Sequence, residues 1–64
     1  MKKKELKNLA KRIADAEFTL QNSTDSAAKA KAQDLILELS SKITSLDDIM
    51  TVDELVQEIL SQKT

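Results

Sequence analysis

The 64-residue chain contains no Gly, Pro, Cys, His, Trp or Tyr. Because soluble proteins average about 7% Gly and 5% Pro, a chain of this length would ordinarily hold about seven or eight of the two together. Tight hairpins depend on residues that accept positive φ, above all Gly. Helices that begin with Ser, Thr or Asp at the N-cap need neither residue. The two absences therefore predict an all-α protein.

The same absences exclude most catalytic chemistry. Without His or Cys the chain has no imidazole base, no thiolate nucleophile and no zinc site of the usual kind. Without Gly it has no phosphate-cradling loop of the P-loop or dinucleotide type. Carboxylates remain, but their spacing fits neither a calcium loop nor a substrate pocket. We expect a protein that is not an enzyme and uses no cofactor, metal or small-molecule substrate.

Long apolar runs are also missing. The longest is the three-residue run 35–37, which is far too short to span a membrane. The chain opens with MKKK, as signal peptides do, but no apolar segment of seven or more residues follows. The lack of Cys fits a reducing compartment. We expect a cytoplasmic protein, and the composition is typical of a small bacterial one.

Helical periodicity is the main signal in the residues that are present. Apolar residues spaced 3, 4, 3 and 4 apart predict a first helix over about 3–21. A second apolar stripe predicts a helix over about 26–45. The first stripe comprises Leu6, Leu9, Ile13, Ala16 and Leu20, and the second comprises Ala28, Ala32, Leu35, Ile36, Leu39, Ile43 and Leu46.

Polar residues mark the boundaries of these helices. Ser23, Thr24 and Asp25 each fit as the N-cap of the second helix. Thr51 and Glu54 match a capping box, flanked by apolar residues at 50 and 55 that fit a hydrophobic staple. This pattern predicts a third helix over about 52–62, preceded by a short helical turn at 45–49.

Together these segments predict one domain over residues 1–64, a small antiparallel three-helix bundle with two long helices and a shorter C-terminal one. Short linkers favour antiparallel neighbours. A domain of about 64 residues buries only about 60% of its extended-chain surface. Association with another chain therefore fits the size, and the bundle closes either within one chain or between chains.

Charge is distributed unevenly although the net charge is only −1. Residues 1–12 carry a net charge of +5, and residues 45–64 carry −4. The basic segment is a candidate contact for anions or nucleic acid. Its members are Lys2, Lys3, Lys4, Lys7, Lys11 and Arg12. Nucleic-acid binding is the less favoured hypothesis, because Phe18 is the sole aromatic residue and the chain as a whole is slightly acidic. A membrane-surface role is disfavoured because the apolar face lacks interfacial aromatics.

Two large apolar residues lie away from the predicted seams. Phe18 points away from the first seam and Leu37 from the second, and Ala14 and Ala30 extend their respective faces. Either the third helix or the rotation of the helices covers one of these residues, or they form a second apolar surface that recruits another chain. We therefore predict a non-catalytic module for protein–protein interaction or self-association, with a small nucleic-acid-binding or regulatory protein as the alternative.

Overall fold

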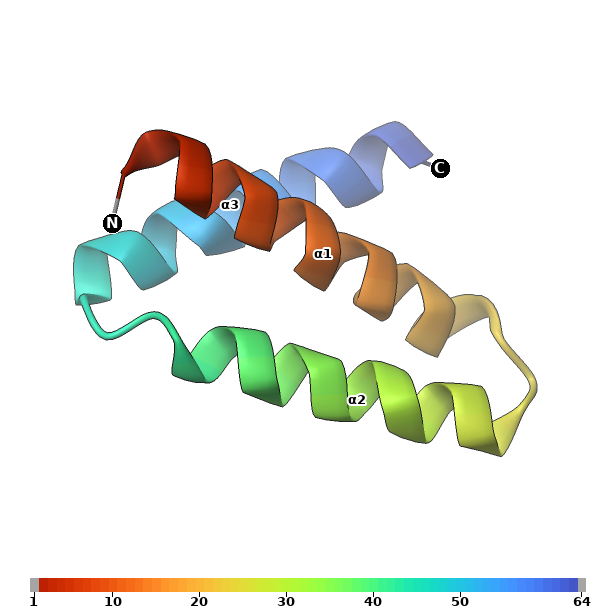
Figure 1. Ribbon diagram of the computed structural model, residues 1–64. Helices are drawn as coiled ribbons and strands as arrows, with labels where there is room; N and C mark the ends of the chain where they lie inside the picture. Colours follow the sequence, from red (N-terminus) through yellow and green to blue (C-terminus); the bar gives the residue numbers. More distant parts are fainter. Residues whose placement is uncertain (1, 64) are drawn as a thin grey trace.

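The computed structural model describes residues 2–63 and contains three helices (Figure 1). They are α1 (Lys3–Asn22), α2 (Ser26–Ser41) and α3 (Leu46–Lys63). The prediction of an all-α, three-helix domain is confirmed, with no strand anywhere in the described range. No helix within that range is both long and apolar enough to cross a membrane.

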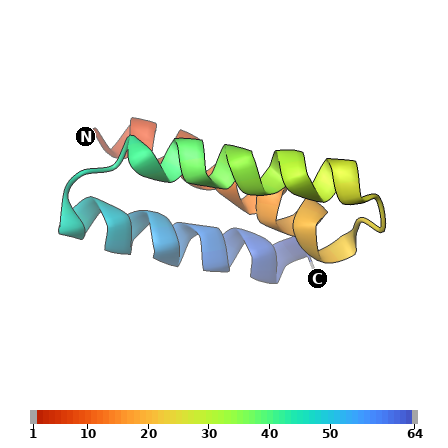
Figure 2. The same ribbon diagram turned by 90° about the horizontal axis from the view of Figure 1, so that it is seen from below.

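Helix α1 holds the fold together. It packs against both α2 and α3, which make few contacts with each other. Figure 2 shows α2 and α3 along opposite edges of the molecule with α1 visible between them. The start of α1 and the start of α3 lie at one end, and the 23–25 connection lies at the other (Figure 1).

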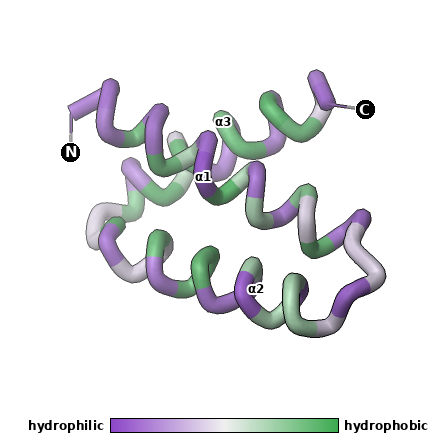
Figure 3. The backbone as a smooth tube through the Cα atoms, turned by 45° about the vertical axis from the view of Figure 1, so that its right-hand side comes forward, coloured by the Kyte–Doolittle hydropathy of each residue, from purple (hydrophilic) through white to green (hydrophobic). Residues whose placement is uncertain are grey.

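The core is built from small and medium side chains. Hydropathy alternates around each helix, and the first turn of α1 is hydrophilic (Figure 3). Helix α1 contributes six buried residues, whereas α2 and α3 contribute two each. The core cluster consists of Leu6, Leu9, Ala10, Ile13, Ala14, Leu39, Ile43, Val52 and Val56. No large side chain among them is completely shielded from solvent.

Asp25 is the N-cap of α2, one of the three residues that fit this role from the sequence. The carboxylate of Asp25 accepts a hydrogen bond from the amide of Ala27 at 3.1 Å. The hydroxyl of Ser23 accepts a bond from the Asp25 amide instead, which shapes the approach to the cap. Polar side chains thus close this turn without Gly.

Helix α2 ends at Ser41, four residues before the predicted end at 45. The amides of Lys42 and Ile43 bond to the carbonyls of Leu39 and Ser40, which tightens the last turn. Leaving the helix here lets Ile43 turn into the core, where it is 8% exposed. The apolar spacing predicted a longer helix because Ile43 continues the apolar stripe. A helix that extended past Ile43 would bury it as well.

Helix α3 begins at Leu46, whereas the capping box predicted a start at residue 52. Thr51 is therefore inside the helix, where its hydroxyl donates to the carbonyl of Asp47 at 2.9 Å. Asp47 and Asp48 occupy the first turn and complement the helix dipole there. The third helix spans 18 residues and is longer than α2, not shorter as expected.

Candidate interaction surface

The Phe18 face of α1 lies beside the end of α3. The ammonium group of Lys63 lies 5.1 Å from the centroid of the Phe18 ring and also pairs with the carboxylate of Asp15. Ala14, which was expected to extend this face outward, is 0% exposed and belongs to the core. Phe18 itself is half-buried and lines a hollow of about 520 Å³ between the ends of α1 and α3.

The Leu37 face of α2 is open. Leu37 is 64% exposed, and Ala30 on the same side of the helix is also exposed. Both lie on the side of α2 that looks toward α3, because Gln33 and Leu37 line a hollow together with Leu60 of α3. Of the two candidate surfaces, that of Leu37 is the more exposed, since Phe18 is half-buried.

A groove runs between α2 and α3, with α1 as its floor. It consists of two adjoining hollows of about 470 and 210 Å³ that share Glu17 and Ile36. The first hollow lies toward Gln33 and the second toward Ser40. We call this feature the α2–α3 groove. It exists because α2 and α3 both pack on α1 but barely on each other.

The lining of the α2–α3 groove is poor in charge for a chain in which 33% of residues are charged. Glu17 and Asp53 are its only ionisable residues, and no Lys or Arg lines it. Gln21, Gln33 and Gln57 supply much of its polar character. Depletion of charge, with neutral polar groups around apolar ones, is typical of the central part of a protein–protein interface.

The beginning of α3 carries exposed apolar residues, of which Ile49 lines the groove. Leu46, Ile49 and Met50 are 71%, 45% and 58% exposed. Ile49 and Leu60 line the two hollows of the groove. The 3- and 4-residue apolar spacing of Ile49, Val52, Val56 and Leu60 was the available signal, but it was divided by the predicted start of the helix at 52.

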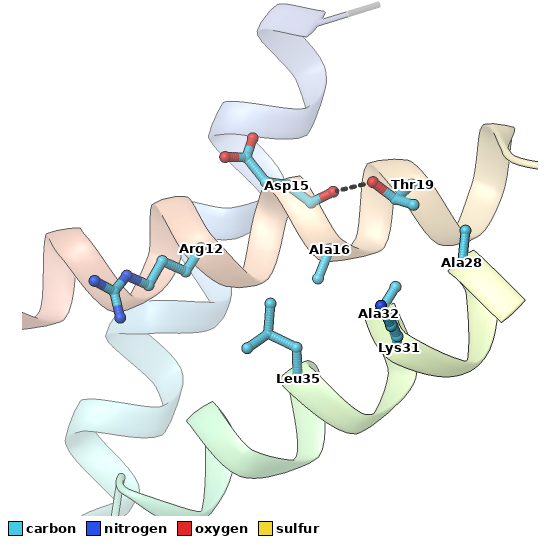
Figure 4. A pocket seen from close by; sticks show the side chains of 8 residues that line it. All are labelled: Arg12, Asp15, Ala16, Thr19, Ala28, Lys31, Ala32 and Leu35. Atoms are coloured by element: carbon cyan, nitrogen blue, oxygen red, sulfur yellow. Dashed lines mark hydrogen bonds between the residues drawn. The ribbon is translucent and has the colours of Figure 1, made fainter.

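A second groove lies on the other side of α2, between α2 and α1 (Figure 4). Ala16 and Leu35 point into a space of about 390 Å³, and charged groups including Arg12 and Lys31 border it. Its floor consists of small side chains that let the two helices approach closely. Leu35 is 40% exposed here, which makes it a matched counterpart of Leu37.

The basic residues of the first segment are fully on the surface. All six candidates, Lys2, Lys3, Lys4, Lys7, Lys11 and Arg12, are exposed. No ion pair within residues 2–63 joins any of them to Asp47, Asp53 or Glu54. Phe18, the single aromatic residue, is half-buried and has the ammonium group of Lys63 over its ring. The arrangement supplies charge without a base-reading element.

No group of three or more potential metal ligands occurs among the described residues. Comparison with models of protein families, with curated proteins and with solved structures gives no match. The inference of function therefore depends on the surfaces described above.

Proposed function

We propose that this chain is a non-catalytic helical interaction module, and that its partner docks in the α2–α3 groove beside Leu37. The observation that carries the proposal is the exposure of Leu37, at 64%, at the edge of a groove that no cation lines. Burying a leucine side chain stabilises a complex by about 1.5–3 kcal/mol relative to leaving it in water. A partner that covers this edge gains that free energy while removing few charged groups from solvent, since Glu17 and Asp53 are the ionisable residues among those that line the groove.

The proposal includes an antiparallel, up-down-up course of the three helices and a cytoplasmic location. Connections of three residues (23–25) and four residues (42–45) support the antiparallel course, because such short links join neighbouring helices end to end. The absence of Cys supports a reducing compartment.

Site-specific photo-crosslinking in living cells tests the proposed seat. A photoreactive residue replaces Gln33, which lines the groove and leaves Leu37 intact. The matched control replaces Asp34, an exposed residue one position later on α2 that lines neither groove. We expect a crosslinked protein adduct of defined mass from position 33 and none from position 34. Equal yields at the two positions, or none at either, would overturn the proposal.

Binding of nucleic acid through the basic segment is the second candidate, supported by the exposure of all six of its cations. A salt titration of binding to generic duplex DNA separates it from the first. A binder that neutralises several phosphates loses affinity steeply between about 50 and 200 mM salt. Absence of binding at the lowest salt concentration would remove this candidate, whereas a steep salt dependence would establish it.

A further inference from the structure

We propose that the occupant of the α2–α3 groove is a second copy of this chain. In this arrangement, a twofold axis relates the copies, their α2 helices cross in opposite directions, and Lys29 of each copy lies against Asp53 of the partner subunit. The inference rests on the proposed function, because it names the partner for the same groove.

The first argument is surface area. The chain exposes 4780 Å². A compact monomer of 7.1 kDa is expected to expose only about 4,100 Å² from the scaling of surface with mass. The excess is close to the roughly 800 Å² that each partner buries in a standard interface. The Cα atoms span 34 × 24 × 16 Å, so the molecule is thin in one direction, and a thin shape exposes more surface than a compact one of the same mass.

The second argument is shape. A twofold interface uses the same surface patch on both subunits, so that patch must contain both a projection and a recess. Here the recess is the α2–α3 groove, and the projection is the adjoining edge of α2 that carries Ala30 and Leu37. The edge of one copy can therefore enter the groove of the other, and the reverse occurs at the same time.

The third argument is charge. Asp53 lines the hollow at the Ser40 end of the groove, and Glu17 lies where the two hollows adjoin. Lys29 is exposed near the other end of α2, four residues before Gln33 and so on the same side of the helix. Antiparallel crossing of two α2 helices brings the beginning of one helix over the end of the other. The ammonium group of Lys29 then meets the acidic end of the partner's groove, which has no cation of its own.

Sedimentation equilibrium over a wide range of concentration is the first test. We expect the wild-type chain to equilibrate between monomer and dimer, and Leu37→Ser to raise the dissociation constant at least about tenfold, as for other central interface residues. The matched control, Leu35→Ser, removes an exposed leucine from the opposite side of α2 and should change the constant less than about threefold. If Leu37→Ser lowers helicity, Ala30→Glu tests the same edge, because Ala30 is exposed and contributes nothing to the core.

A charge exchange tests the orientation. Lys29→Glu and Asp53→Lys should each weaken the dimer by about threefold to tenfold, because each places like charges together at two symmetric contacts. The double variant K29E/D53K restores opposite charges and should return the constant to within about threefold of wild type. A double variant no better than the single ones would overturn the proposed arrangement.

The outcomes separate this inference from the proposed function. A wild-type chain that stays monomeric at every concentration overturns the inference. If the crosslinker at position 33 then still captures a different protein, the groove is an interaction site with another occupant. If the crosslinked adduct has twice the mass of the chain and the charge exchange restores the dimer, both proposals are supported.

Discussion

Helices α1 and α2 resemble each other in sequence pattern but differ in how much of their apolar surface is buried. α1 buries six of its 20 residues, whereas α2 buries two of its 16. The difference arises because α1 packs against two helices and α2 packs mainly against one. A helix with a single neighbour buries only the part of its apolar stripe that faces this neighbour. Leu35 and Leu37 therefore remain exposed on the two sides of the contact. The available interaction surface is a consequence of position in the bundle.

The largest expected effect comes from truncating Leu39, the most deeply buried residue of α2. Leu39 is 2% exposed, so Leu39→Ala should cost about 2–5 kcal/mol through lost burial and the resulting cavity. The free energy of unfolding in urea, followed by circular dichroism at low protein concentration, measures this loss. Leu37→Ala is the control and should cost less than about 1 kcal/mol in the monomer. Equal losses from the two variants would show that the two sides of α2 are alike in solution.

The next largest effect on stability should come from enlarging the buried Ala14 of α1, and the comparison is the exposed Ala30 of α2. Ala14 of α1 is 0% exposed, so Ala14→Leu should destabilise the chain by about 1–3 kcal/mol through overpacking. Ala30→Leu on the exposed edge of α2 should change the stability by less than about 0.5 kcal/mol. Thermal unfolding of the two variants at the same low concentration compares them directly. Tolerance of leucine at position 14 would contradict the tight packing of α1.

The start of α2 can be tested by removing its cap. Asp25→Ala should cost about 1 kcal/mol, because the amide of Ala27 loses its acceptor. Thr24→Ala should have little effect, and Ser23→Ala should have an intermediate one, since the Ser23 hydroxyl accepts from the Asp25 amide. Urea unfolding of the three single variants ranks them. A larger loss from Thr24→Ala than from Asp25→Ala would show that Thr24, and not Asp25, is the N-cap of α2.

The smallest effect concerns the start of α3. Because Thr51 lies inside the helix, Thr51→Ala should stabilise the chain slightly, by a few tenths of a kcal/mol, since alanine has the higher helix propensity. A helix that began with Thr51 as its N-cap would instead lose about 1 kcal/mol. The sign of the change in thermal midpoint therefore distinguishes a helix that begins at Leu46 from one capped by Thr51. Asp53→Ala, at an exposed position nearby on α3, is the reference substitution.

The sequence alone led to the three helices and most of the α1 core, because a 3- and 4-residue apolar spacing is a local property. It failed at 42–51, where two local signals competed with packing. Ile43 continues the stripe of α2 but reaches the core from outside the helix, and the capping-box pattern at Thr51 is overridden by a helix that is already under way. A local sequence pattern reveals neither the burial of Ile43 from outside α2 nor the early start of α3, because each depends on where the neighbouring helix lies.

The candidate surface shows the same division. The displacement of Leu37 and Phe18 from their seams could be calculated from helical periodicity, as could the two alternatives for what covers them. Only the tertiary structure decided that Lys63 of α3 lies over Phe18 while Leu37 stays exposed, since this depends on the side of α1 against which the third helix packs. The missing Gly and Pro were enough to predict a helical protein. The separation of α2 from α3, a matter of how three helices share one core, created the groove.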